Sequence, residues 1–176
     1  MCSSDLGQIQ EIRQPDSSEI QMSVRNMGQT YWLLASVDAR FARLHLLSSR
    51  SPNPPTPPNF CMVLRRYLEN GFVHAVRQRD FDRIVEIEVL SRGEGEEPTL
   101  VTLMGEFMGK HSNLILVREN GKIIDAIKRI PQRLNRFREI LPGATYLSPP
   151  KQSNPYDPRN PEDRSEEHTS ELQSPC

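Results

Sequence analysis

The dipeptide Asp82-Arg83 is the first candidate for chemistry in this sequence. It stands between the polar stretch RQRD (77–80) and a strand-like alternation over 84–89. An arginine presents a planar fork of donors to a phosphate or a base edge, and a neighbouring aspartate can orient that fork or accept from a base amino group or a 2′-hydroxyl. The same two residues could instead form an internal salt bridge at a turn, which stabilises little when exposed. The residue types leave both interpretations open.

Two further segments carry side chains that could bind a ligand. Gly109 is followed by Lys110-His111-Ser112-Asn113 between two apolar runs, where a turn needs Gly and Asn but also displays hydrogen-bonding groups. Residues 128–138 are the most basic stretch, and this basicity indicates either a solvated face or contact with RNA phosphates. The basic residues of this stretch are Lys128, Arg129, Arg133, Arg136 and Arg138.

Catalysis has little support in the residues. Glu86 and Glu88 share a strand face, but alternating glutamates are typical of the solvated side of a half-buried sheet. Cys61 lies in an apolar helical pattern, where a small buried residue is expected. The sequence has no phosphate-binding glycine loop and no His/Cys cluster with metal-ligand spacing. We therefore expect a protein that is not an enzyme and has neither cofactor nor metal.

The two ends of the chain resemble a translated sequencing adapter. CSSDL (2–6) and RSEEHTSELQS (164–174) correspond to the two strands of the same adapter, so we expect residues 1–6 and 164–176 to be artefacts. The formal net charge of the whole chain is −1. The excluded ends hold one basic and four acidic residues, which leaves a core near +2. Such a core lacks the strong overall basicity that would indicate nucleic-acid binding by charge alone.

Cys61 is the single cysteine of residues 7–163, and no apolar run approaches the roughly 18 residues of a membrane span. A lone buried cysteine argues against a disulfide framework and fits a reducing compartment. We expect a cytoplasmic protein that does not bind a membrane.

The pattern along the core is mostly short strands. A Pro-rich connector (51–58) precedes a helix over 59–71, with Asn59 as N-cap and Gly71 as C-terminal stop. One further turn of helix is predicted near 133–140. Strands are predicted over 7–14, 19–26, 30–37, 41–48, 72–78, 83–91, 99–108, 113–119 and 122–130. This order predicts an α+β fold, mainly an antiparallel β-sandwich or strongly curved sheet with one or two packed helices.

Six ordered blocks resemble the N-terminal domain of the NFACT family, which is also known as fibronectin-binding protein A-like. They are IQEIRQPDSSEIQMSVRN, PPNFCMVLRRYLENG, RDFDRIVEIEV, MGKHSNLILV, GKIIDAIKRI and REILPGATYLSPPKQ. The resemblance implies a domain over 7–148 that lacks its usual opening helix, and a Pro-rich connector (149–163) to later regions. It also implies a fold similar to the N-terminal domain of formamidopyrimidine-type DNA glycosylases.

The resemblance implies a non-catalytic factor of ribosome-associated quality control. Such factors bind large ribosomal subunits obstructed by a stalled peptidyl-tRNA and recruit charged tRNA, alanyl-tRNA in bacteria, for C-terminal tailing of the nascent chain. Peptide-bond chemistry then belongs to the ribosome. The alternatives are a fibronectin-binding surface adhesin and a DNA-processing enzyme related by fold. The Pro-Glu catalytic start of the glycosylases is absent from this sequence.

The resemblance also assigns roles to individual residues. Asp82-Arg83 matches an Asp-Arg pair that engages tRNA in the family. Lys110, His111, Asn113 and Arg129 are further candidate RNA contacts. Family members usually have Arg where Lys110 stands, and a lysine lacks the bidentate fork of an arginine.

Overall fold

The computed structural model describes residues 6–52, 54–79, 82–92 and 97–150. Residues 1–5 of the predicted artefactual start (1–6), the predicted artefactual end (164–176) and most of the predicted connector (151–163) lie outside these residues. Within the described part, one α-helix accompanies a nine-stranded sheet. The elements are β1 (Gln8–Asp16), β2 (Glu19–Asn26), β3 (Gln29–Ser36), β4 (Arg43–Leu47), α1 (Asn59–Leu68), β5 (Phe72–Gln78), β6 (Ile84–Ser91), β7 (Thr99–Glu106), the 3-10 turn η1 (Gly109–His111), β8 (Asn113–Arg118) and β9 (Ile123–Ala126).

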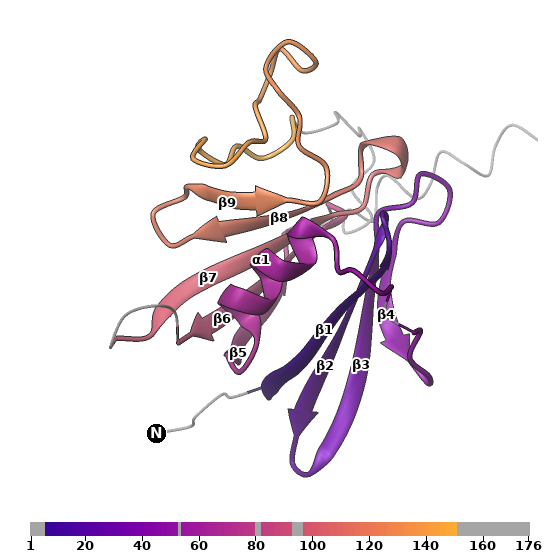
Figure 1. Ribbon diagram of the computed structural model, residues 1–176. Helices are drawn as coiled ribbons and strands as arrows, with labels where there is room; N and C mark the ends of the chain where they lie inside the picture. The colour runs from indigo at the N-terminus through magenta and orange to yellow at the C-terminus, as the bar shows by residue number, and fades with distance from the viewer. Residues whose placement is uncertain (1–5, 53, 80–81, 93–96, 151–176) are drawn as a thin grey trace, which may run out of the picture.

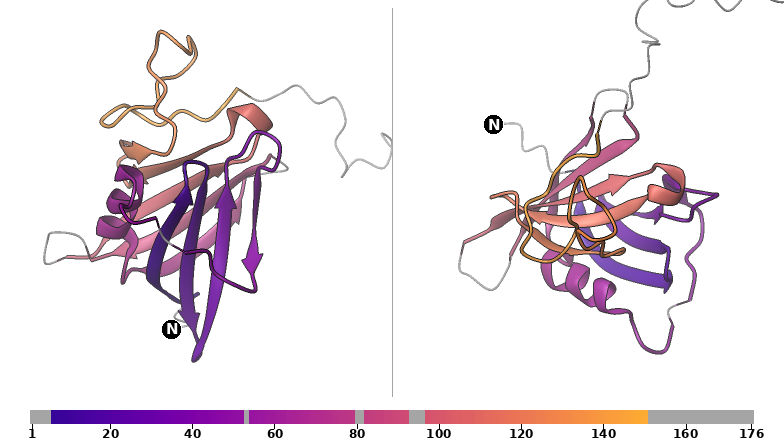
Figure 2. Two further views of the ribbon diagram at one scale, coloured as in Figure 1. Left: turned by 45° about the vertical axis from the view of Figure 1, so that its right-hand side comes forward. Right: turned by 90° about the horizontal axis from the view of Figure 1, so that it is seen from above.

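The sheet is antiparallel, and its strand order is β4-β3-β2-β1-β5-β6-β7-β8-β9. β1 and β5 share one ladder pair, Gln8 with Phe72, and backbone hydrogen bonds between residues 6–9 and 70–73 flank it, so the sheet consists of two halves with a narrow junction. Figures 1 and 2 show the halves diverging from this junction, with α1 beside them. The predicted α+β class, with antiparallel sheet predominating, is confirmed, and the strongly curved single sheet is the form that it takes.

Alternating apolar residues build one core between the two halves. Ile12 and Met22 from the first half join Val89 and Leu116 from the second, and each is buried. The helix α1 adds its apolar stripe, Phe60, Cys61, Leu64 and Leu68, to this core. A smaller cluster on β6–β9 is covered by the chain after β9. Its buried members are Ile84, Met104, Ile115, Val117, Ile123, Ala126 and Ile140.

The ends of α1 differ from the prediction. Pro58 occupies the N-cap, while the side chain of Asn59 instead donates to Asp125 Oδ2 at 3.3 Å. At the other end the left-handed residue is Asn70, with φ 64°, rather than Gly71. Gly71 is required for space, since a Cβ there would lie 2.7 Å from Val89 Cγ1.

The segment after β9 also differs from the prediction. β9 ends at Ala126, and residues 133–140 contain no helix. Residues 131–139 instead form a loop, which we call the basic loop. Its base is closed by a bridge in which Ile130 and Ile140 exchange backbone hydrogen bonds of 2.9 and 2.8 Å. The basic loop projects above β9 at the top of Figure 1.

Candidate nucleic-acid interface

The turn between β5 and β6 holds Asp82-Arg83 in place through its backbone. Arg79 N–H donates to the Ile84 carbonyl at 3.0 Å, and Asp82 N–H donates to the Arg79 carbonyl at 3.0 Å. The Arg83 carbonyl accepts from Phe107 N–H at 2.8 Å. The adjoining ends of β5, β6 and β7 therefore fix this turn while leaving both candidate side chains free.

Neither side chain of the dipeptide is used inside the described part of the protein. Asp82 is half-buried and Arg83 is exposed, and within the described residues neither side chain makes a hydrogen bond or an ion pair. The structural arginine of this turn is Arg79, which pairs with Glu86 and also donates to Ser148 Oγ. The geometry therefore argues against the internal salt bridge between Asp82 and Arg83.

The two strand glutamates have structural partners. Glu86 pairs with Arg79, and Glu88 pairs with Arg77 at 2.9 Å. Each glutamate is half-buried on β6, which lies between β5 and β7. The face predicted to be plainly solvated is thus a ladder of cross-strand ion pairs.

A hollow of about 270 Å³ opens beside the free dipeptide. Asp82 and Arg83 form one wall, and Met108 with Gly109 forms another. The remaining wall, Pro149-Pro150, is held near the turn because Ser148 binds Arg79. One ligand in this hollow would meet the Asp82 carboxylate and the Arg83 guanidinium together.

The turn after β7 contributes two exposed cationic or polar side chains. Lys110 and His111 are exposed on η1, whereas Ser112 and Asn113 are buried. The Asn113 amide links β8 to the chain after β9, since its Nδ2 donates to the Lys128 carbonyl at 2.8 Å and its Oδ1 accepts from Lys128 N–H at 3.1 Å. Both ends of this amide are occupied, so Asn113 has a structural part and offers nothing to a ligand here.

A larger groove of about 540 Å³ continues from the first hollow, and the two share Met108, Pro149 and Pro150. Its lining includes Lys110, His111, Lys128 and Arg136 but no aspartate or glutamate among the described residues. Burial lowers the pKa of Lys128, whose Nζ donates to the Val37 carbonyl at 2.8 Å. Because its described lining holds cationic side chains and no carboxylate, the groove is electropositive and suits an anionic partner.

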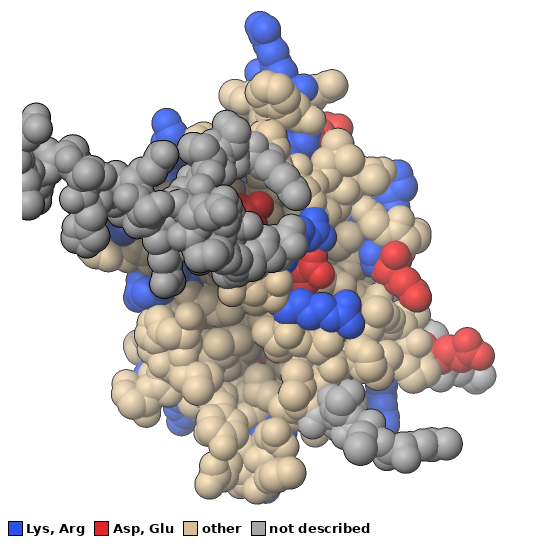
Figure 3. All heavy atoms as spheres, turned by 180° about the vertical axis from the view of Figure 1, so that it is seen from behind, with Lys and Arg blue, Asp and Glu red and all other residues tan. Residues whose placement is uncertain are grey.

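The basic loop is anchored by a buried ion pair. Arg138 binds Glu106 with both terminal nitrogens, at 2.6 and 2.5 Å, and donates to the Leu147 carbonyl at 3.0 Å. Tyr146 Oη donates to Glu106 Oε1 at 2.9 Å. Seen from behind, Lys and Arg side chains occupy the projecting loop at the top of Figure 3.

Arg129 lies away from this surface. Ile127 and Arg129 line a separate hollow near the start of α1, while Lys128 and Ile130 line the groove. Arg129 binds Asp125 through Nε at 2.8 Å and Nη2 at 2.9 Å, and this hydrogen bonding raises its pKa. The structure thus separates Arg129 from Lys110 and His111.

A model of the NFACT N-terminal and middle domains matches residues 5–174. The chain belongs to the NFACT family. A curated relative, the Rqc2 homolog RqcH of Streptococcus suis (strain 05ZYH33), is 43% identical over 153 residues, which are 85% of this chain and 28% of that relative. The chain thus spans little more than a quarter of the length of this relative.

Two solved structures share the NFACT fold with this chain. The N-terminal part of the fibronectin/fibrinogen-binding protein from Streptococcus suis has a TM-score of 0.80 at 43% identity, over 83% of this chain and 55% of that chain. The N-terminal domain of fibronectin-binding protein PavA from Streptococcus pneumoniae has a TM-score of 0.81 at 38% identity, over 89% of this chain and 59% of that chain.

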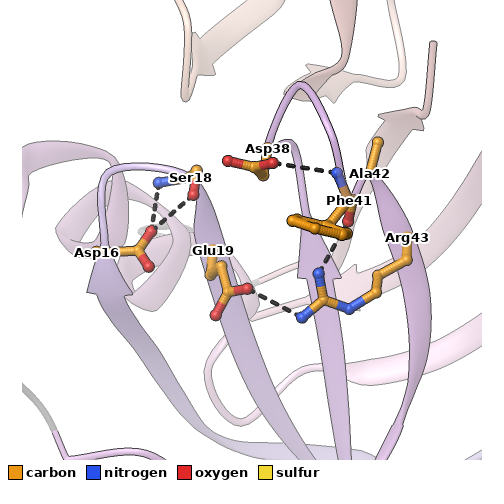
Figure 4. Close-up of a pocket in the computed structure, with 7 residues that line it drawn as sticks. All are labelled: Asp16, Ser18, Glu19, Asp38, Phe41, Ala42 and Arg43. Carbon is orange, nitrogen blue, oxygen red and sulfur yellow. Dashed lines mark hydrogen bonds and ion pairs between the residues drawn. The ribbon is translucent and has the colours of Figure 1, made fainter. Parts of the chain in front are cut away.

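A second concave region of this NFACT domain has the opposite charge. Asp16, Glu19 and Asp38 gather between the β1–β2 turn and the loop before β4 (Figure 4). Asp38 accepts from the backbone N–H of Arg40 at 2.8 Å, which lowers its pKa, and Glu19 binds Arg43 at 3.2 Å. These carboxylates stabilise local turns and would repel a polyanion.

Other features limit what the described residues can do. They contain no group of three or more His, Cys, Asp and Glu side chains that could hold a metal ion. None of their helices is long and apolar enough to cross a membrane.

Sequence reasoning missed two features of the NFACT domain. The Glu106–Arg138–Tyr146 network joins Glu106 to Tyr146, which is 40 positions later, and no local sequence pattern predicts such a contact. The exposed side chains of Leu134 and Phe137 had a signal, because they are apolar residues in a basic stretch with no strand partner.

Proposed function

We propose that this NFACT domain is the RNA-binding module of a translation quality-control factor. The complete factor binds large ribosomal subunits obstructed by a stalled peptidyl-tRNA and recruits charged tRNA, alanyl-tRNA in bacteria, for C-terminal tailing. The domain acts by binding and positioning in the cytoplasm and is not an enzyme. The relationship to RqcH supports this proposal at the level of the family.

The observation that carries the tRNA-binding role is the unpaired Asp82-Arg83 dipeptide at the edge of an electropositive groove. Arg83 can direct its fork at a phosphate or a base edge, while Asp82 can accept from a base amino group or a 2′-hydroxyl. Because the backbone on both sides is fixed, little ordering is needed when RNA binds. Lys110 and His111 lie on the continuation of the same surface and would contact phosphates.

The test measures binding of alanyl-tRNA to the complete protein by fluorescence anisotropy. Arg83→Ala and Asp82→Ala are each expected to weaken binding at least about fivefold, which corresponds to roughly 1 kcal/mol or more. Arg83→Lys should recover only part of the loss, because lysine keeps the charge without the fork. Co-sedimentation with obstructed large subunits should persist in these variants.

A matched control is Arg25→Gln, since Arg25 is an exposed arginine on β2 near the β2–β3 hairpin. It should leave tRNA affinity unchanged. Unchanged affinity in Arg83→Ala, or a loss of affinity explained by a melting temperature lowered by many degrees, would contradict the assignment of the dipeptide.

A second candidate function is adhesion to fibronectin. The names of the solved relatives from Streptococcus suis and Streptococcus pneumoniae favour it. It predicts that the complete protein is displayed on the cell surface and binds immobilised fibronectin irrespective of Asp82 and Arg83. Absence from the surface of intact cells would exclude this role.

A further inference from the structure

The tip of the basic loop exposes apolar and cationic side chains together. Leu134 is 73% exposed and Phe137 is 79% exposed, although large apolar side chains are usually buried. Arg133 and Arg136 are exposed beside them and have no ion pair within the described residues. Residues 128–140 contain five basic residues and one acidic residue, Glu139.

The basic loop is held in a defined place. Its base is closed by the paired backbone of Ile130 and Ile140, and Leu134 N–H donates to the Pro131 carbonyl at 2.9 Å. Phe137 N–H donates to Asn135 Oδ1 at 2.9 Å. The next residue, Arg138, is buried against Glu106. The neighbours of Phe137 are therefore fixed to the domain while its ring remains in solvent.

The basic loop also belongs to the groove. Leu134, Asn135, Arg136 and Phe137 line the same 540 Å³ hollow as Lys110 and His111. A partner that extended from Asp82-Arg83 into this groove would meet Phe137 among its lining residues. The 540 Å³ groove itself has no aspartate or glutamate among its described lining residues, so an anionic partner suits it.

We propose that the basic loop is a second RNA contact, in which Phe137 stacks on an unpaired base while Arg133 and Arg136 bind the flanking phosphates. An aromatic ring between cations is the arrangement by which proteins bind single-stranded nucleic acid. An acidic protein segment would pair with the arginines but would leave the ring without a stacking partner. The inference rests on the proposed function, since both require RNA along this groove, and it adds the preference for unpaired nucleotides.

The experiment uses the complete protein with three probes: an RNA stem-loop, a blunt RNA duplex of equal strand length, and poly-glutamate. Phe137→Ala is expected to weaken stem-loop binding about fivefold or more, as stacking contributes about 1–3 kcal/mol per base, and to leave duplex binding nearly unchanged. Phe137→Trp should retain binding, and its fluorescence should be quenched by the stem-loop and not by the duplex.

The arginines are tested together. The double variant Arg133→Gln/Arg136→Gln should weaken the binding of both the stem-loop and the duplex. The steepness of log affinity against log salt should fall by about 0.7–0.9 per lost phosphate contact. Arg25→Gln, which removes one exposed positive charge on β2, should do neither. If Phe137→Ala weakens stem-loop binding and duplex binding equally, or weakens neither, Phe137 does not stack on an unpaired base. Tight poly-glutamate binding that depends on the loop would identify an acidic protein partner instead.

The two proposals can fail separately. If Asp82→Ala and Arg83→Ala weaken tRNA binding while the loop variants do not, the proposed function stands and the second contact is wrong. If the loop variants weaken stem-loop binding while Asp82→Ala and Arg83→Ala do not, the second contact stands and the assignment of the dipeptide to tRNA is wrong.

Discussion

At the residue scale, the buried pair of Glu106 and Arg138 is the contact on which the candidate interface depends most. Their side chains are 0% and 7% exposed, and the pair joins the end of β7 to the basic loop. Removing one partner leaves an uncompensated charge in the interior. Glu106→Gln is therefore expected to lower the free energy of unfolding by about 3–5 kcal/mol in guanidinium denaturation.

The matched control is the pair of Arg77 with Glu88, in which the arginine side chain is 61% exposed. Glu88→Gln should cost less than about 1 kcal/mol, because the exposed guanidinium of Arg77 stays hydrated when its partner is lost. A cost for Glu106→Gln no larger than that of Glu88→Gln would show that the buried pair is not a structural anchor.

Tyr146 gives the same network a pH dependence. Burial, with Glu106 nearby, raises the pKa of Tyr146 above its ordinary value. Below about pH 10 the folded and unfolded states both keep the proton, so the stabilising contribution is fully present. At higher pH the unfolded state ionises first, and the free energy of unfolding falls as the pH approaches the folded pKa.

A titration followed by tyrosine absorbance would detect this shift. Tyr146 should contribute a component that ionises above the ordinary tyrosine pKa in the native protein, and Tyr146→Phe should remove that late component. The free energy of unfolding of Tyr146→Phe should also fall less steeply above pH 10. If Tyr146→Phe removes an early component instead, the hydrogen bond to Glu106 does not form in solution.

At the element scale, the end of α1 needs one residue with a left-handed backbone and one residue without a Cβ, and two different residues meet these needs. Asn70 has the left-handed backbone, and Gly71 has the close contacts. Asn70→Gly should leave the free energy of unfolding within about 0.5 kcal/mol, and Asn70→Ala should lower it by about 1 kcal/mol. Gly71→Ala should lower it by about 1–3 kcal/mol, because its Cβ would press on Val89.

Thermal unfolding of the three variants would check this order. The reverse result, with Asn70→Ala neutral and Asn70→Gly damaging, would place the left-handed residue elsewhere. The sequence predicted the helix and its approximate end because the apolar spacing is local. It could not decide between Asn70 and Gly71, because the contact with Val89 comes from a strand 18 positions later.

The difference between local patterns and long-range contacts also explains which site residues the sequence could locate. A polar dipeptide between two strand patterns predicts an exposed turn, and Arg83 is exposed there. The basic run 128–138 predicted one surface, but its cations have different partners: Asp125 for Arg129, Glu106 for Arg138 and the Val37 carbonyl for Lys128. Asn113 likewise became structural through Lys128. Long-range partners decide which polar residues remain free, and spacing does not encode them.

At the scale of the whole molecule, the NFACT domain concentrates opposite charges at different places. The groove from Asp82-Arg83 to Phe137 is basic, whereas the hollow of Figure 4 holds Asp16, Glu19 and Asp38. The formal net charge of −1 is therefore distributed unevenly, with basic and acidic side chains gathered at different places on the surface. The predicted likeness of the fold to the N-terminal domain of formamidopyrimidine-type glycosylases stays a prediction.

The two halves of the sheet share one core, and this predicts how the domain unfolds. They are joined along the sheet where residues 6–9 meet residues 70–73, and Ile12 and Met22 also pack in one cluster with Val89 and Leu116. Neither half can lose this contact without exposing the apolar face of the other, so we expect one cooperative transition.

Two probes, one in each half of the sheet, test this expectation. Trp32, the one tryptophan, reports on β3 in the first half through its fluorescence. Amide hydrogen exchange of Leu114 and Leu116 reports on β8 in the second half. In guanidinium the two probes should give the same midpoint and slope, and Val89→Ala, a cavity in the shared core, should shift both by the same amount. Separate midpoints, or a shift confined to β8, would show that the narrow junction divides the sheet into independently unfolding halves.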